Sequence, residues 1–84
     1  MLSKKKKIME FTVVFEKATG GGYIATIPSL PGCMTQGETF EETEKMAEDA
    51  IMCYCESLVK HGEPIPDETE EYVGKISVPI MVGK

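Results

Sequence analysis

The alternation of apolar and polar positions predicts two strands in the first third of the chain. Residues 8–17 alternate, and the aromatic and β-branched side chains of one face are Phe11, Val13 and Phe15. A second alternating stretch covers residues 23–27. The glycine-rich segment 18–22 between them predicts a hairpin turn. Such glycines can also cradle a phosphate, but that arrangement requires a helix N-terminus after the glycines, and here a strand follows.

A turn and a short third strand come next. Pro28 ends the second strand, because proline cannot donate a ladder hydrogen bond. Pro31 and Gly32 form a turn signal, in which proline sets φ and glycine is free to take a positive φ. Residues 33–36 then predict a third strand, paired with the second as an antiparallel hairpin.

One long helix is predicted over Phe40–His61. Thr39 is a favourable N-cap residue, and Glu42 three positions later completes a capping box. Gly62 suits the left-handed position that follows a helix C-terminus. Spacings of three and four define an apolar stripe, which we expect Met46 and Cys53 to widen. The stripe consists of Ala47, Ala50, Ile51, Tyr54 and Leu58.

The last strand is predicted over residues 72–82, after the proline-containing loop 62–71. Aliphatic residues occupy every second position: Ile76, Val78, Ile80 and Val82. Pro79 lacks an amide donor, so this strand should lie at a sheet edge. The helix returns the chain, so a right-handed crossover places the fourth strand parallel to the first. We expect an α+β fold, β-β-β-α-β, with sheet order 3-2-1-4 and the helix on one sheet face.

Length and charge narrow the functional classes. Residues 8–84 form one domain after a flexible lysine-rich segment, residues 1–7, whose run Lys4–Lys7 is either a solvated terminus or a patch for nucleic acid or membrane. The net charge is −5, but from Ile8 onward five lysines stand against fourteen acidic residues, and there is no arginine. This composition disfavours direct nucleic-acid binding and favours a basic protein partner. One helix leaves one sheet face uncovered, so we expect a homodimer or homotetramer.

The chain carries neither a signal peptide nor an apolar run of membrane-spanning length, so we expect a soluble cytoplasmic protein. Its three cysteines are an odd number, which favours free thiols in a reducing compartment. Cys53 and Cys55 are about 200° apart around a helix and cannot share a metal ion. We therefore predict no metal site and no cofactor.

Several short motifs occur together along residues 12–66. They are Phe15-Glu16, Gly22-Tyr23, Leu30-Pro31-Gly32-Cys33, the Gly37-x-Thr39 helix start and Gly62-Glu63-Pro64-Ile65-Pro66. In this combination the chain resembles the HicB family of type II antitoxins. The resemblance implies a fold like a truncated ribonuclease H. It also implies a function: binding and neutralising a small, basic, mRNA-cleaving HicA-like toxin.

Many members of that family carry a C-terminal DNA-binding domain. This sequence stops at Lys84, two residues after the last predicted strand, so we expect no such domain and no operator binding. The toxin-facing residues cannot be taken from a motif. We predict that the partner-binding residues are Glu16, Pro31, Gly32, Cys33 and Glu38.

Two alternatives belong to other classes. The domain could be an orphan homo-oligomeric binding module, or a vestigial metal-dependent nuclease. Ribonuclease H chemistry needs several carboxylates around two Mg²⁺ ions. Glu16, Glu38 and Asp49 are candidate ligands, but no aspartate lies in the middle of the first strand. His61 stands at the helix C-terminus, where it more often stabilises the helix dipole than acts as a base. We therefore expect a protein that is not an enzyme.

Overall fold

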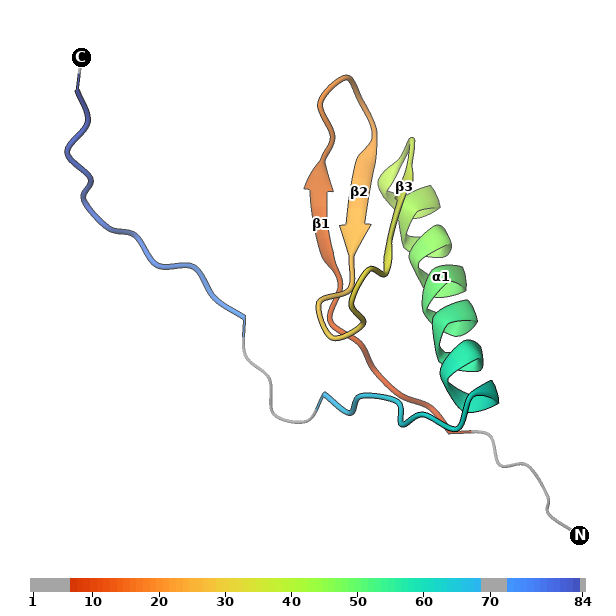
Figure 1. Cartoon of the computed structure of the whole chain (residues 1–84). Helices are drawn as coiled ribbons and strands as arrows, with labels where there is room; N and C mark the ends of the chain where they lie inside the picture. The colour runs from red at the N-terminus through yellow and green to blue at the C-terminus, as the bar shows by residue number, and fades with distance from the viewer. Residues whose placement is uncertain (1–6, 69–72, 84) are drawn as a thin grey trace, which may run out of the picture.

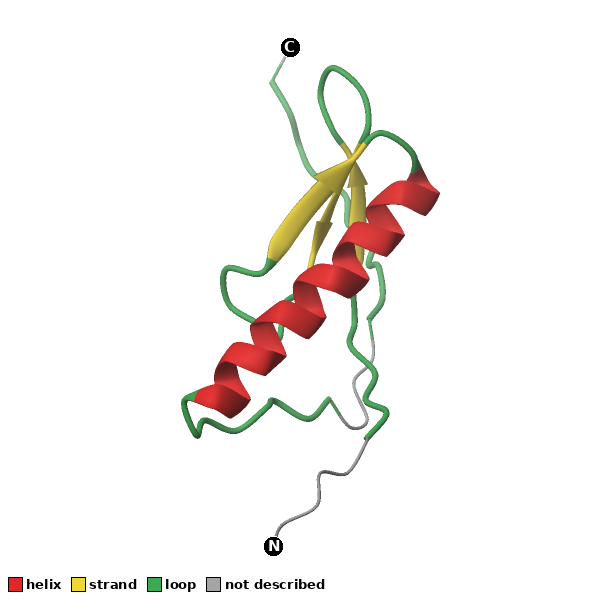
Figure 2. Cartoon of the chain, turned by 90° about the vertical axis from the view of Figure 1, so that its right-hand side faces the viewer, coloured by secondary structure: helices red, strands yellow, loops and turns green. Residues whose placement is uncertain are grey.

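The computed structural model describes residues 7–68 and 73–83 of the 84-residue chain. A three-stranded antiparallel sheet with strand order β1-β2-β3 carries one long helix on one of its faces (Figures 1 and 2). The elements are β1 (Val14–Lys17), β2 (Tyr23–Thr26), β3 (Met34–Gly37) and α1 (Phe40–Lys60). The predicted α+β class, the antiparallel meander and the helix are confirmed.

The helix begins and ends as the sequence predicts. The Thr39 hydroxyl accepts a hydrogen bond from the Glu42 amide at 3.0 Å, and the Glu42 carboxylate accepts one from the Glu38 amide at 2.6 Å. The predicted cap bond of Thr39 is present, whereas Glu42 reaches one residue further back than in a regular capping box, to the amide of the residue before the cap. Two amides at the helix start are thereby satisfied. His61 is the C-cap, and Gly62 follows with a φ of +72°.

The core lies between the sheet and α1. Register pairs Phe15 with Ala25 and Ala25 with Thr35, and the Phe15 ring lies 4.6 Å from the Phe40 ring of α1, so this row faces the helix. The residues that are at most 5% exposed are Ala25, Ile27, Leu30, Cys33, Thr43 and Ala47. The chain after β2 folds inward at Ile27, Leu30 and Cys33, which form the buried cluster that α1 covers.

The prediction of the apolar helix stripe is confirmed for its central residues and wrong for Met46 and Cys53, which were expected to widen it. The helix residues that pack against the buried cluster are Ala50, Ile51, Tyr54, Cys55 and Leu58. Met46 is 44% exposed and Cys53 is also exposed, so neither widens the stripe. The opposite side widens instead, through Cys55, and Thr43 extends the centre of the stripe by one turn toward the helix start. The helix lies over β2 and β3 and is displaced from the sheet centre toward β3.

The predicted fourth strand is not part of the sheet. Residues 73–83 are extended and exposed, and they run clear of the domain (Figure 1); Tyr72 lies outside the described residues. The sheet therefore has order β1-β2-β3 in place of 3-2-1-4, and a ribonuclease H-like architecture is not established. Alternating side chains specify which face a segment must bury, but a strand also needs a neighbouring strand for its ladder.

The first strand is shorter than predicted. It covers four residues, and Ile8, where the predicted strand begins, is 83% exposed. The end of the β1–β2 ladder is closed by a side chain: Glu68 accepts hydrogen bonds from the Thr12 amide, at 2.7 Å, and from the Ser29 hydroxyl. These hydrogen bonds of Glu68 hold the chain after α1 beside the residues that precede β1.

Candidate functional site

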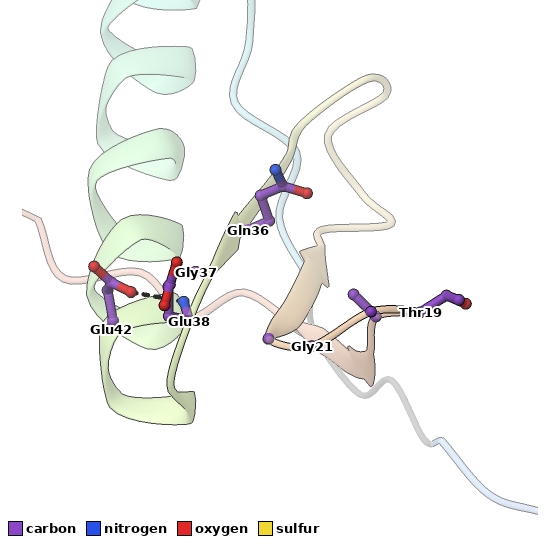
Figure 3. Close-up of a pocket in the computed structure, with 9 residues that line it drawn as sticks. Thr19, Gly21, Gln36, Gly37, Glu38 and Glu42 are labelled. Carbon is purple, nitrogen blue, oxygen red and sulfur yellow. Dashed lines mark hydrogen bonds between the residues drawn. The ribbon is translucent and has the colours of Figure 1, made fainter.

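A polar depression lies at one end of the sheet, where the β1–β2 turn meets the start of α1 (Figure 3). It encloses about 540 Å³ and is lined by the turn, the end of β3 and the first turn of the helix. Its lining residues are Ala18, Thr19, Gly20, Gly21, Gly22, Gln36, Gly37, Glu38 and Glu42. The turn is closed by hydrogen bonds from the Ala18 amide to the Gly22 carbonyl and from the Gly21 amide to the Ala18 carbonyl.

Glycine is required where the turn approaches β3. Gly22 has a φ of +79°, and a Cβ atom there would lie 2.5 Å from the Gly37 carbonyl oxygen. Both the left-handed backbone and the short distance exclude a side chain at this position. The glycine-rich segment therefore serves to bring the hairpin turn against the strand that leads into α1.

The depression carries two carboxylates from one helix start. Glu42 is held by its bond to the Glu38 amide, whereas the side chain of Glu38 is exposed. Figure 3 shows both residues beside Gly37, at the end of β3. Negative charge is favourable here because the helix N-terminus carries a partial positive charge. The result is an acidic rim that a basic group of a partner can approach from solvent.

The predicted residue Glu16 lies on the other face of the sheet. Register aligns Glu16 of β1 with Ile24 of β2 and Gln36 of β3, one row away from the helix-facing pair Phe15 and Ala25. Because neighbouring rows point to opposite faces, Glu16 and Gln36 project from the face that α1 leaves uncovered. Glu16 does not line the depression. Two strand spacings, about 10 Å, separate its strand from β3, which leads to Glu38.

The predicted loop residues lie at the opposite end of β3 from Glu38. Pro31 and Gly32 are exposed, and the Pro31 carbonyl accepts a hydrogen bond from the Tyr54 hydroxyl at 2.9 Å. A four-residue strand spans about 13 Å, so the loop and the depression form two separate surfaces. The structure therefore does not bring the five predicted residues together.

Cys33 belongs to the core and not to a contact surface. It is 5% exposed, and burial raises the pKa of its thiol above the usual 9.0, with smaller contributions from the charges of Cys55 and Cys53. Burial also raises the pKa of the Cys55 thiol. Both groups stay protonated near neutral pH, so they act as small apolar side chains.

The sequence analysis did not identify two parts of this surface. The turn residues Thr19–Gly22 were interpreted only as a connection, and Gln36 only as a strand residue. The long run of three glycines is the signal that marks a close backbone approach. A second, apolar groove of about 880 Å³ lies between β1 and α1 and was also not predicted; its walls include Phe11, Val13, Phe15, Ala47, Ile51 and Cys55.

Residues 7–68 and 73–83 contain neither a metal-binding cluster nor a membrane-spanning helix. In this part of the chain, no three histidine, cysteine, aspartate or glutamate side chains are placed to hold one metal ion. The ring Nδ1 of His61 lies 2.8 Å from the Ser57 carbonyl oxygen, at the helix end far from Glu38. No helix of the described part combines the length and apolar character needed to cross a membrane.

Comparisons with known proteins identify the family. Residues 11–77 match the family model described as a HicB-like antitoxin of bacterial toxin–antitoxin systems. The chain is 43% identical over 65 residues to a UPF0150 protein of Thermoplasma acidophilum, covering 77% of this chain and 94% of that protein. It is 46% identical over 63 residues to a UPF0150 protein of Synechocystis, covering 75% and 80% of the two chains.

Similarity also extends to proteins that are named antitoxins. The chain is 34% identical over 76 residues to antitoxin HicB 1 of Photorhabdus laumondii, covering 90% of this chain and 49% of that protein. It thus spans about half the length of this relative. Since the family match includes the whole sheet, the helix and the segment after it, the chain belongs to the HicB-like antitoxin family.

Proposed function

We propose that this protein is a non-enzymatic antitoxin that binds and neutralises a small, basic, mRNA-cleaving toxin of the HicA type. The observation that carries the proposal is the family match over residues 11–77, which contains every helix and strand that the structure describes. The relatives named antitoxin HicB align over 76 residues, which is 88–90% of this chain.

The charge distribution supports a basic protein as the partner. The net charge from Ile8 onward is −9, carried without a single arginine. The exposed face of α1 contributes Glu41, Glu44, Glu48 and Glu56, which lie on the surface together with the acidic rim at Glu38. Such a field raises the rate of encounter with a basic protein and repels nucleic acid, so the proposed partner is the toxin itself and not its RNA substrate.

We assign toxin contact to the two exposed parts of the predicted set. The first is the acidic end of the sheet, with Glu38 at the depression and Glu16 on the uncovered face. The second is the exposed turn at Pro31 and Gly32. The Cys33 side chain is excluded from this assignment because it is buried.

The test is co-expression of this chain with a HicA-like toxin, followed by co-purification and an RNA-cleavage assay with and without this protein. A stable complex in which RNA stays intact supports the proposal. The double variant Glu16→Lys and Glu38→Lys should weaken binding and restore cleavage, because each reversal places positive charge against a basic partner.

Glu63→Lys is the matched control. Glu63 is exposed and follows the C-terminal end of α1, so the control makes the same change in charge as each single reversal, at the other end of the helix from Glu38. Wild-type affinity is expected for it. If the double variant binds and inhibits like the wild type, these contacts are wrong. If no complex forms with the wild-type chain, the orphan-module alternative replaces the antitoxin proposal.

We also propose that the protein is a homodimer or homotetramer. The uncovered sheet face carries the half-buried Ile24 together with Val14 and Met34, which are 38% and 59% exposed. Light scattering at micromolar concentration tests this point, and a monomeric mass would refute it.

A further inference from the structure

The outer edge of β1 has no neighbouring strand in the described part of the chain, and an apolar groove runs beside it. Antiparallel pairing alternates along a strand, and the Ala18 amide bonds the Gly22 carbonyl at 2.9 Å. Two and four residues earlier, Glu16 and Val14 therefore direct their backbone groups toward β2. The amides and carbonyls of Phe15 and Lys17 consequently point outward, away from the sheet.

The groove beside this edge offers apolar cover to an added strand. One wall is formed by Phe11, Val13 and Phe15, from β1 and the residues before it. The other wall is one side of α1, at Ala47, Ile51 and Cys55. The rim of the groove carries Glu44 and Glu48. An open edge next to an apolar groove is the feature that natural proteins normally pair or cover.

Residues 73–83 have the complementary properties. They are extended and exposed, and the exposed fractions of their apolar side chains are 74% at Val73, 88% at Ile76, 61% at Val78, 69% at Ile80 and 81% at Val82. This C-terminal segment contains Lys75 and no acidic residue, which matches the acidic rim of the groove. The radius of gyration, 16.8 Å, exceeds the roughly 12 Å of a compact chain of this length, and the segment lies apart from the sheet and the helix (Figure 1).

The position of Pro79 sets the orientation of this segment as a strand. Pro79 lacks an amide, so its backbone must face the free edge of the sheet. The neighbouring residues Val78 and Ile80 then direct their amides and carbonyls toward the adjacent strand. These two residues also share one face with Ile76 and Val82, so the hydrogen-bonding set and the aliphatic set coincide.

We propose that residues 73–83 of one chain add as a strand to the β1 edge of a second copy, with Ile76, Val78 and Ile80 covering the groove between β1 and α1 of that copy. The exchange is reciprocal and closes as a two-fold dimer. A second copy is the occupant because residues 73–83 lie outside the sheet of their own chain, and because their aliphatic face and Lys75 suit the apolar walls and acidic rim of the groove. The proposal rests on the self-association proposed above and is independent of toxin binding.

Substitution of the full-length chain tests the role of the segment. Val78→Asp should raise the dissociation constant of the dimer at least about tenfold, equivalent to 1.4 kcal/mol, because it places a carboxylate against the apolar groove. The control Ser77→Asp puts the same charge on the opposite face of the segment and should leave the dimer intact. Analytical ultracentrifugation measures both, with circular dichroism confirming that the helix is retained. An unchanged dissociation constant for Val78→Asp overturns the exchange.

Isotope-mixed cross-linking identifies which chain the segment contacts. A photoreactive residue is placed at position 80, and equal amounts of ¹⁴N and ¹⁵N chains are unfolded and refolded together. Exchange predicts cross-links from position 80 to residues 11–17 or 44–55 that join one ¹⁴N and one ¹⁵N peptide. Links confined to peptides of the same isotope would show that the segment folds onto its own domain, and would overturn the proposal. A monomeric wild type refutes self-association as a whole, whereas a dimer without these links refutes only the exchange.

Discussion

The close approach between Gly37 and Thr43 joins the sheet to the start of the helix, and Gly37→Ala tests its importance. A Cβ atom at position 37 would lie 2.7 Å from the Thr43 hydroxyl oxygen, 2.9 Å from the Thr43 amide nitrogen and 3.0 Å from its Cα. Two of these three atoms are backbone atoms of α1. The substitution therefore requires the first turn of the helix to move away from β3.

The expected cost follows from two opposing effects. Overpacking of a close contact costs about 1–3 kcal/mol. Replacing glycine by alanine also restricts the unfolded chain, which returns about 0.4–1 kcal/mol. A net loss of about 1–2 kcal/mol corresponds to a melting temperature lowered by about 4–16 °C in a domain of this size.

The measurement is thermal and urea unfolding at a fixed protein concentration, because self-association makes apparent stability depend on concentration. Gly83→Ala is the control: no atom lies within 4 Å of the added Cβ, and it should leave the melting temperature within about 2 °C of the wild type. Thr43→Ala in the Gly37→Ala background removes the hydroxyl but not the backbone contacts, so a double-mutant cycle should show a favourable coupling of about 0.5–1 kcal/mol. A Gly37→Ala protein as stable as the wild type would refute the steric argument.

Two substitutions probe the cap and the core, and two measurements on the unchanged protein probe the thiols. Thr39→Ala removes the acceptor for the Glu42 amide and should lower the free energy of unfolding by about 1 kcal/mol, measured in urea; an unchanged midpoint would contradict the cap. Leu30→Ala empties a site that is 1% exposed and should cost about 2–5 kcal/mol, with a loss below 1 kcal/mol counting against its place in the core. Cys53 should be alkylated fastest near neutral pH and Cys33 slowest, because Cys53 is exposed and burial raises the pKa of Cys33; mass spectrometry of a labelling time course distinguishes them. Since the raised pKa favours the protonated folded state, this contribution to stability should be complete below pH 9.0 and decline above it, which urea titrations across that range would detect.

The helix was predictable from sequence because its signals are local. The capping pair Thr39 and Glu42, the three- and four-residue spacing and Gly62 each act within a few positions of one another, and the structure confirms all of them. The residues at the margin of the buried stripe could not be predicted from local signals. Thr43 is fully buried where the missing side chain of Gly37 lets β3 approach it, and Cys55 packs on the buried cluster whereas Met46 and Cys53 are exposed. Both features depended on packing against the sheet.

For the candidate site, too, the sequence indicated individual residues, whereas the tertiary structure decided how they are arranged. Glu16, Pro31, Gly32 and Glu38 are exposed, but their arrangement does not form one site, and partner binding by them stays a prediction. Glu16 and Glu38 belong to strands separated by β2, and the Pro31 turn lies at the other end of β3. Cys33 sits beside an exposed turn in the sequence yet is buried, because the chain folds inward between Ile27 and Cys33, joined by the hydrogen bond from the Ile27 amide to the Cys33 carbonyl.

The sequence by itself determined the first three strands, the hairpin, the helix and its cap, and the family, since these depend on local backbone preferences, periodicity and short motifs. The tertiary structure decided which face of the helix is buried, which predicted residues share a surface, and that residues 73–83 stand outside the sheet of their own chain. The alternation of apolar and polar residues in that segment indicates a strand that buries one face and pairs with a neighbouring strand. The alternation does not indicate which chain provides the neighbouring strand and the apolar surface, because pairing at a sheet edge depends on residues distant in sequence and not on the order of residues within the strand.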